Sequence, residues 1–222
     1  MTGNPLAGKL DVIAYTPYSY IYHAVRDTST VLKCHEMCDG KQHGVRELAT
    51  ARTLEHEAAI YRKLRNHPRI TSCFGLEEVA PHVNALSLER SPIGSVRHYI
   101  VKHSGVNQTP PMSVRLRLAM HFTEGMAYLH ANGIMWSDAS VRNAMLFSGE
   151  DGLLEVKLCD FGAAILPEGS GGSEFEPCQS YEMQYQLPLR GRADWDDIQR
   201  LNQELFALGC AIYELTEEDA AS

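Results

Sequence analysis

The sequence predicts an α+β fold in which a small strand-rich lobe is followed by a larger helix-rich lobe. The first third of the chain carries short apolar and aromatic runs separated by turn-forming residues, which is typical of strands. Two longer segments repeat their apolar residues with the helical period. A nearly continuous apolar segment around residue 210 indicates a buried helix. A ligand is expected in the cleft between two such lobes.

The predicted strands begin with a hairpin. Residues 21–25 (IYHAV) and 30–33 (TVLK) are strand-like runs, and the polar stretch 26–29 (RDTS) between them has the composition of a turn. Residues 70–78 and 85–89 are predicted to form further short strands of the same lobe.

The first helix is predicted over residues 47–66 and ends before Pro68. Glu57 lies within the apolar stripe of this helix, on the side that faces the interior. A buried carboxylate is costly unless a cation meets it, so the pattern calls for a cationic partner of Glu57. The apolar members of the stripe are Leu54, Ala58, Tyr61 and Leu64.

The helix-rich lobe is predicted from three patterns. Residues 113–131 form a helix with Ser113 as its N-cap and one buried face. Residues 144–147 and 156–159 form a strand pair around a Gly-containing turn. Residues 205–215 (LFALGCAIYEL) are apolar on nearly every side, which predicts a helix that is buried all round. The buried face of the first of these helices contains Leu118, Phe122, Met126 and Leu129.

The composition is that of an ordinary globular protein, with 44% hydrophobic and 22% charged residues. The 20 basic and 28 acidic side chains give a formal net charge of −8, which argues against nucleic acid or an anionic membrane as the main partner. No apolar run approaches the length of about 18 residues that a membrane span needs. The first residues also lack the pattern of a secretory signal. We therefore expect an intracellular protein, cytoplasmic in preference to nuclear.

The six cysteines have no framework spacing, so reduced thiols are expected. One cluster, Cys34, His35, Cys38 and His43, offers four potential zinc ligands. Its spacing matches no common zinc finger, and the adjacent Cys34 and His35 side chains would diverge on a strand. Ordinary thiols are the favoured interpretation.

Four features in sequence order point to one chemistry. Lys33 ends an apolar strand, and Glu57 lies on the buried side of the next helix. Asp138 is followed five residues later by Asn143 in a polar loop, and the triplet 160–162 (DFG) follows a short strand. Phosphoryl transfer from a nucleotide needs such groups: a fixed cation for the phosphates, hard oxygen ligands for Mg²⁺, and a carboxylate for the acceptor hydroxyl.

In these motifs, their order and their spacing, the chain resembles the protein kinase family from about residue 12 to residue 216. The resemblance implies a single protein-kinase-like domain over residues 1–222 with two lobes. The N-lobe would span about 10–90, the hinge about 89–94 and a partial C-lobe about 95–222. The C-lobe would be truncated after the family's central buried helix.

The resemblance also implies roles for the charged residues. Lys33, paired with Glu57, would hold the α- and β-phosphates of ATP. Asp138 would be the catalytic base, and Asn143 and Asp160 would bind Mg²⁺.

The segment LSLERSPIGSV resembles the kinase hinge. Leu88 would be the gatekeeper, and the backbone of Glu89 and Ser91 would face the adenine. The walls of the adenine slot would be Ile21, Val31 and Met145.

Several departures from the family pattern affect substrate binding. Ala14, Thr16 and Ser19 stand where the family's phosphate-binding loop has glycines, so backbone contact with the phosphates should be poorer. Ser140 replaces the lysine of serine/threonine kinases, whereas Arg142 matches an arginine of tyrosine kinases.

Further departures concern regulation and the end of the chain. Ser137 removes the arginine that docks a phosphorylated activation loop, so activation by that route is not expected. Residues 185–189 resemble a degraded Ala-Pro-Glu motif in which Leu189 replaces the glutamate. Without the later helices, the apolar helix 205–215 should expose apolar surface, and we expect a partner that covers it, low solubility or an incomplete gene product.

Each of these residues also has a plain structural interpretation. Lys33 is compatible with a solvated strand-edge charge, and Glu57 with a helix surface if the stripe is slightly rotated. Asp138 and Asn143 are compatible with turn caps. Their joint occurrence, and the need of Glu57 for a cation, favour the kinase-like interpretation.

The leading functional hypothesis is a protein kinase-like phosphotransferase that uses ATP and Mg²⁺. It would move the γ-phosphate to a protein hydroxyl, serine or threonine in preference to tyrosine. The alternative is a pseudokinase that binds nucleotide or a protein partner without turnover, which the lost glycines and the altered Trp-Ser-Asp loop favour. A third interpretation, a small-molecule phosphotransferase, is disfavoured by the hinge and buried-helix resemblance.

Overall fold

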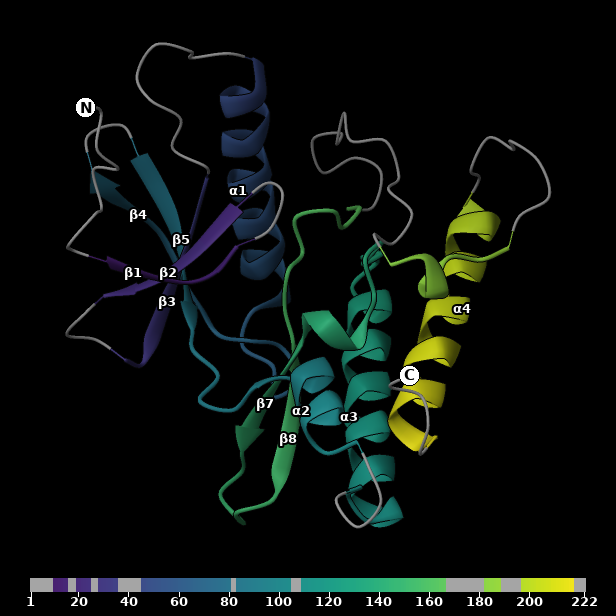
Figure 1. Ribbon diagram of the computed structural model, residues 1–222. Coiled ribbons are helices and arrows are strands. Elements are labelled where there is room, and N and C mark those ends of the chain that lie inside the picture. The colour runs from purple at the N-terminus through teal and green to yellow at the C-terminus, as the bar shows by residue number, and fades with distance from the viewer. Residues whose placement is uncertain are drawn as a thin grey trace. The chain divides into compact units, whose positions relative to one another are not determined.

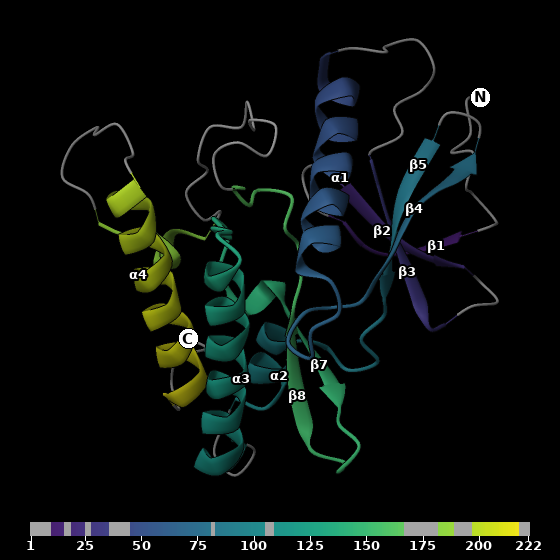
Figure 2. The same cartoon turned by 180° about the vertical axis from the view of Figure 1, so that it is seen from behind.

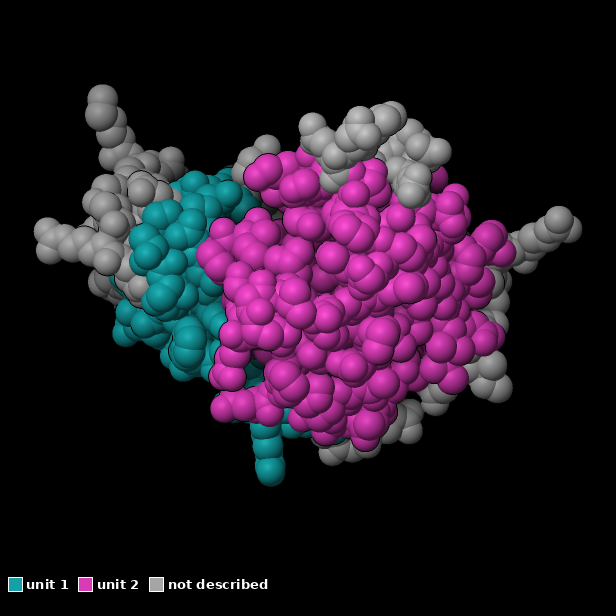
Figure 3. All heavy atoms as spheres, turned by 90° about the horizontal axis from the view of Figure 1, so that it is seen from below, with its two compact units in different colours: residues 1–65, 72–90 teal, residues 66–71, 91–222 magenta. Residues whose placement is uncertain are grey.

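The structure is a computed structural model, shown in Figure 1 and from behind in Figure 2. The chain forms two compact units, residues 1–65 with 72–90 and residues 66–71 with 91–222 (Figure 3). The described residues are 10–15, 19–24, 28–35, 45–80, 83–104, 109–166, 182–188 and 197–217.

The first unit is a five-stranded antiparallel sheet with one long helix beside it (Figure 1). The strand order is β1-β2-β3-β5-β4, so β3 lies in the middle of the sheet. The predicted hairpin is present as β2 and β3, with Ile21 opposite Lys33. The elements are β1 (Leu10–Tyr15), β2 (Ser19–Ala24), β3 (Thr30–His35), α1 (Val45–Leu64), β4 (Cys73–Ala80) and β5 (Val83–Glu89).

Helix α1 contacts β3, β4 and β5 through the stripe that the sequence predicted. The four apolar stripe residues are at most 5% exposed, and Glu57 is fully buried among them. The helix ends at Leu64, before the predicted end, because Arg65 takes a left-handed conformation with φ of 54°. The Arg65 N–H still donates to the Tyr61 carbonyl at 3.0 Å and closes the last turn.

The second unit combines a small antiparallel sheet with helices. The strand order is β6-β7-β8, and α3 contacts both β8 and α4 (Figure 1 and Figure 2). The predicted strand pair is present as β7 and β8. The elements are β6 (Gly94–Ser95), α2 (Val96–Lys102), α3 (Met112–Ala131), the 3₁₀ turn η1 (Val141–Asn143), β7 (Ala144–Ser148), β8 (Leu154–Leu158), the 3₁₀ turn η2 (Met183–Tyr185) and α4 (Asp197–Thr216).

The start of α3 differs from the prediction, although its buried face is correct. The four predicted core residues of this helix are at most 1% exposed. The helix begins at Met112 behind Pro111, so Ser113 lies in the first turn and the prediction of Ser113 as N-cap is wrong. Pro111 has a fixed φ, here −50°, and its carbonyl accepts from the Arg115 N–H at 3.2 Å, which starts the helix early.

Helix α4 is buried on one side only, so the prediction that it is buried all round is wrong. Ala207, Ala211 and Leu215 are at most 2% exposed, whereas Leu205 is 50% and Tyr213 is 62% exposed. The expectation of exposed apolar surface on this helix is therefore confirmed, and a covering partner stays a prediction. Within the part of the chain that the structure describes, no helix has the length and hydropathy needed to cross a membrane.

Gly125 lies where α3 packs closely against β8. A Cβ atom at this position would lie 2.6 Å from Leu158 Cδ1 and 3.3 Å from the Arg69 carbonyl oxygen. An added methyl group would therefore overlap with the Leu158 side chain and crowd the Arg69 backbone. We predict that Gly125→Ala lowers the free energy of unfolding by roughly 1–3 kcal/mol, as overpacking does. Urea denaturation measures this change.

Gly209 in α4 provides the matched control, because a Cβ atom there would meet nothing within 4 Å. Gly209→Ala should be neutral or stabilise the protein by up to about 1 kcal/mol through helix propensity. Equal effects of the two substitutions would show that α3 and β8 are not closely packed at Gly125.

Candidate active site

A buried ion pair joins strand β3 to helix α1. Lys33 Nζ lies 2.7 Å from Glu57 Oε2, and the two side chains are 9% and 0% exposed. The predicted need of Glu57 for a cation is thus confirmed. Because β3 has hydrogen-bonded neighbours on both sides, Lys33 is not a solvated charge on a sheet edge. Burying two charges costs desolvation free energy that offsets their mutual attraction. The pair therefore adds little to the stability of the fold, and its main effect is to hold the Lys33 ammonium group in a fixed position.

The neighbouring Cys34 points to the opposite face of the sheet, where it packs with Tyr22, Leu32 and Ala85. Burial, reinforced by the charge of Glu77, raises the pKa of the Cys34 thiol to about 12. A protonated, buried thiol is a poor metal ligand, which supports the interpretation as an ordinary thiol. Cys38 and His43, the more distant members of the zinc cluster, lie outside the described residues.

The residues predicted to contact the adenine are divided between the two units. In the first unit, Leu88 is buried and lies opposite Val31. The Glu89 carboxylate accepts from the Ser72 hydroxyl at 3.0 Å, and this fixes the end of β5. Ile21 and Val31 are half-buried in the first unit, while Ser91 and the half-buried Met145 belong to the second. Their roles stay predictions.

Asp138 is held in place by the residues of its own loop. It is 4% exposed, and its Oδ2 accepts from Asn143 Nδ2 at 2.8 Å and from Arg142 Nη2 at 2.9 Å. Asn143 Nδ2 also donates to the Asp138 carbonyl at 3.0 Å. Two donors on one carboxylate oxygen leave Asp138 little rotational freedom.

The backbone of this loop is strained and is anchored by a glutamate of α4. Ser137 has φ of 66°, a conformation that is costly for a residue with a side chain. The N–H groups of Trp136 and Ser137 donate to the Glu204 carboxylate at 3.0 and 2.7 Å. Glu204 is 2% exposed, so these bonds are strong and offset part of the strain.

Two hydrogen bonds, one to Asp160 and one from its neighbour Cys159, join this segment to the loop. Trp136 Nε1 donates to the Asp160 carbonyl at 3.0 Å, and the Cys159 N–H donates to the Asn143 carbonyl at 2.9 Å. Asp160 also has a left-handed backbone, with φ of 59°. The Trp136 ring, fully buried, packs on Phe161 with 5.9 Å between ring centroids. The segment that carries Asp160 is therefore joined to the Asp138 loop by two hydrogen bonds and one ring contact.

The chemistry of the donor set fits a magnesium ion. A carboxylate at Asp160 and an amide oxygen at Asn143 are the hard oxygen ligands that Mg²⁺ prefers. Because the Asn143 amide nitrogen donates to Asp138, the amide oxygen points away from those bonds. In the described ranges, this site included, no group of three or more His, Cys, Asp or Glu side chains is placed to hold a metal.

Sequence reasoning missed Glu204 and the function of the Trp136 ring. Glu204 lies on the same face of α4 as Ala207 and Ala211, so it could have been found by the argument that singled out Glu57. The ring N–H of Trp136 gave no comparable signal, because its partner is a backbone carbonyl 24 residues away.

Comparison with known proteins identifies the family. The protein kinase domain matches residues 18–221, and the chain therefore belongs to the protein kinase family. It is 32% identical over 115 residues, 52% of its length, to the serine/threonine-protein kinase STY46 of Arabidopsis thaliana. It is 28% identical over 165 residues, 72% of its length, to the mouse leucine-rich repeat serine/threonine-protein kinase 1. It is 26% identical over 171 residues, again 72% of its length, to the yeast serine/threonine-protein kinase PKH2.

The chain spans only part of these relatives. The matched regions cover 18%, 8% and 14% of their respective lengths. The family and its two-lobed α+β fold are therefore established for this chain. Its activity, substrates and partners are the subject of proposals.

The buried Lys33–Glu57 pair leads to a prediction about the free energy of unfolding. Lys33→Met leaves the Glu57 carboxylate buried without this cation, so we predict a loss of about 3–5 kcal/mol in the free energy of unfolding. The double variant Lys33→Met/Glu57→Leu removes both charges and should lose less than Lys33→Met alone. Guanidinium denaturation of the purified variants measures both values.

Lys63, an exposed lysine of the same helix as Glu57, provides the control. Lys63→Met should change stability by less than about 0.5 kcal/mol, as exposed substitutions do. A double variant that is less stable than Lys33→Met would contradict the assignment of Glu57 as the buried partner.

Proposed function

We propose that this chain is a protein kinase that moves the γ-phosphoryl group of ATP to a protein hydroxyl. The observation that carries the proposal is the Lys33–Glu57 ion pair, with a distance of 2.7 Å and almost complete burial. An ammonium group held in one orientation by a buried carboxylate suits a polyanion such as a triphosphate. The relatives named as serine/threonine kinases support the same reaction class.

Each of the two units supplies residues with a proposed role in the reaction. In the first unit, Glu57 orients the Lys33 ammonium, which binds phosphate oxygens of ATP. In the second unit, the Asp138 carboxylate orients the acceptor hydroxyl and takes its proton as the hydroxyl oxygen bonds to the γ-phosphorus. The bond from this phosphorus to the bridging oxygen breaks, and ADP leaves. Asn143 and Asp160 would hold Mg²⁺, which when bound neutralises phosphate charge.

Serine and threonine are the proposed acceptors, in preference to tyrosine. The named kinase relatives support this choice. Arg142, which matches tyrosine kinases in the sequence, donates to the Asp138 carboxylate. It therefore supports the position of Asp138 and gives no separate argument for a tyrosine acceptor.

A pseudokinase is the second candidate, because the phosphate-binding loop lacks its glycines. Ala14 is exposed at the end of β1, and Ser19 is buried at the start of β2. A buried serine offers the phosphates less than the backbone N–H groups of a glycine loop. In this alternative the chain binds nucleotide or a protein without transferring phosphate.

The proposed setting is the interior of the cell. Cys34, Cys73 and Cys210 are free thiols, which supports a reducing compartment. The proposed partners are ATP and a protein, either as the substrate or bound over the exposed face of α4.

Two substitutions separate binding from turnover. We predict that Asp160→Ala abolishes Mg²⁺-dependent ATP binding, because it removes a metal-ligand carboxylate. Asp138→Asn should preserve binding and stop phosphate transfer, because an amide cannot take the hydroxyl proton. Binding is measured as a thermal shift with and without Mg²⁺. ATP at 100 times its dissociation constant adds about 2.7 kcal/mol of stability. Transfer is measured with radiolabelled ATP.

Glu150, an exposed acid of the turn between β7 and β8, gives the control. Glu150→Gln should bind and turn over ATP like the parent. If Asp160→Ala and Asp138→Asn also behave like the parent, the assigned roles are wrong. Binding by the parent without any transfer would favour the pseudokinase.

A further inference from the structure

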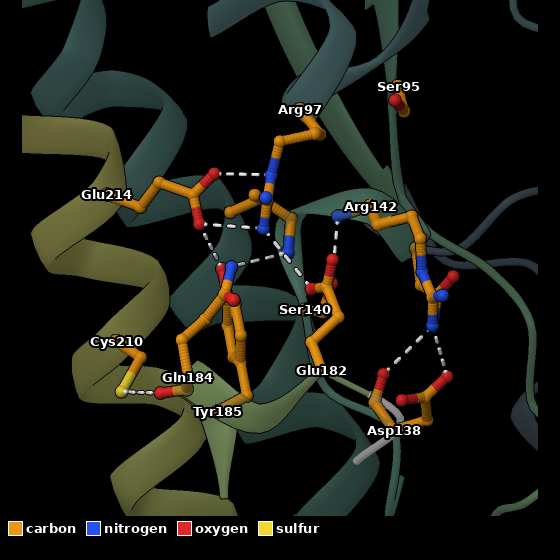
Figure 4. Close-up of polar contacts among 12 residues, drawn as sticks. Ser95, Arg97, Asp138, Ser140, Arg142, Glu182, Gln184, Tyr185, Cys210 and Glu214 are labelled. Atoms are coloured by element: carbon orange, nitrogen blue, oxygen red, sulfur yellow. Dashed lines mark hydrogen bonds and ion pairs between the residues drawn. The ribbon is translucent and has the colours of Figure 1, made fainter. Parts of the chain in front are cut away.

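A cluster of charged and hydroxyl side chains connects α2, η2 and α4 to the Asp138 loop (Figure 4). At its centre, Arg97 of α2 lies between two glutamates (Figure 4). One is Glu214 of α4, 117 residues further along the chain, and the other is Glu182, which precedes η2. The function proposed above uses none of these three residues.

Arg97 binds Glu214 with two of its nitrogens. Nε faces Oε1, and Nη2 donates to Oε2 at 2.9 Å. The Glu214 side chain is 9% exposed. Burial raises the pKa of this carboxyl, while Tyr185 and Arg97 act in the opposite direction. The Tyr185 hydroxyl donates to Glu214 Oε2 at 2.7 Å, so the carboxylate is fixed on two sides.

The same Arg97 nitrogen reaches Glu182. Nη2 donates to Glu182 Oε2 at 3.2 Å, and this oxygen also accepts from the Ser140 hydroxyl at 2.6 Å. Glu182 and Glu214 thus share one guanidinium nitrogen. Without that cation the two carboxylates would repel each other, and the more exposed one, Glu182, would move away from Ser140.

Ser140 connects the cluster to Asp138. Its Oγ accepts from the Arg142 N–H at 3.0 Å and so caps the 3₁₀ turn η1. The last residue of η1 is Asn143, which donates to the Asp138 carboxylate. The Val141 N–H in the same turn donates to the Tyr185 hydroxyl at 3.4 Å. The turn that orients Asp138 is therefore held at two points.

We propose that Arg97 is a positioning residue for the Asp138 loop, acting through Glu182 and Ser140. It fixes η1, and with it Asp138, by a link made wholly of the chain's own side chains. The link needs no phosphate group, which agrees with Ser137 standing where the family has a phosphate-docking arginine. The proposal rests on the proposed function only in taking Asp138 as the group that acts on the substrate.

The test uses Trp136, two residues before Asp138, as a reporter. The chain has two tryptophans, so Trp195→Phe leaves Trp136 as the single emitter. In this background, we expect Arg97→Gln to increase acrylamide quenching of Trp136 at least twofold. Deuterium exchange of the amides of η1 should rise at least tenfold. In the kinase assay, kcat should fall at least tenfold, while KM for ATP changes less than threefold.

Two further variants check the route of the effect. Arg97→Lys keeps the charge and should recover most of the loop order and of kcat. Glu182→Gln added to Arg97→Gln should cause little further change, because both act on one link. If the two effects multiply as for independent sites, the link from Arg97 to Ser140 is wrong. Ser140→Ala breaks the link without a charge change and replaces Arg97→Gln if that variant does not fold.

Arg117→Gln is the matched control, since Arg117 forms a solvent-exposed ion pair with Asp151. It should leave quenching, exchange and kcat unchanged. If Arg97→Gln only lowers the melting temperature, while quenching and exchange of the folded protein match the parent, Arg97 is a structural residue and the proposal is overturned. These two readouts need no turnover, so they decide the proposal even if the chain transfers no phosphate.

Discussion

A glutamate that is removed from water must be met by hydrogen-bond donors, and the described part of the chain buries three such glutamates. Glu57 meets the ammonium group of Lys33 in the first unit. In the second unit, Glu204 meets two backbone N–H groups of the Asp138 loop, and Glu214 meets Arg97 and Tyr185. Since each carboxylate would be costly to bury alone, each fixes the groups around it.

The departures from the kinase pattern are better understood from these contacts than from the motifs. Trp136 belongs to the altered Trp-Ser-Asp loop, and its ring N–H donates to the Asp160 carbonyl. Ser140 replaces a lysine, and its hydroxyl joins Glu182 to the turn that orients Asp138. The altered side chains of this loop thus take part in a hydrogen-bond network around Asp138.

The sequence predicted those parts of the molecule that have a regular period or a local partner. The hairpin followed from strand-like runs on either side of a turn-like stretch, the buried stripe of α1 from helical spacing, and the cation at Glu57 from the cost of burial. The two-residue strand β6 and the seven-residue helix α2 are too short to show a period and were not predicted. The one-sided burial of α4 depends on what packs against it, which composition does not reveal. The bond from Arg97 to Glu182 joins residues 85 apart, and no local rule could pair them.

The left-handed backbone at Ser137 and Asp160 also limits which sequences this loop can explore. A β-branched side chain is strongly disfavoured in that conformation, whereas glycine, asparagine and aspartate adopt it readily. Replacements at position 137 are therefore expected to favour glycine, asparagine and aspartate. The residues that position 137 can accept are thus limited by its backbone conformation as well as by the chemistry of the side chain.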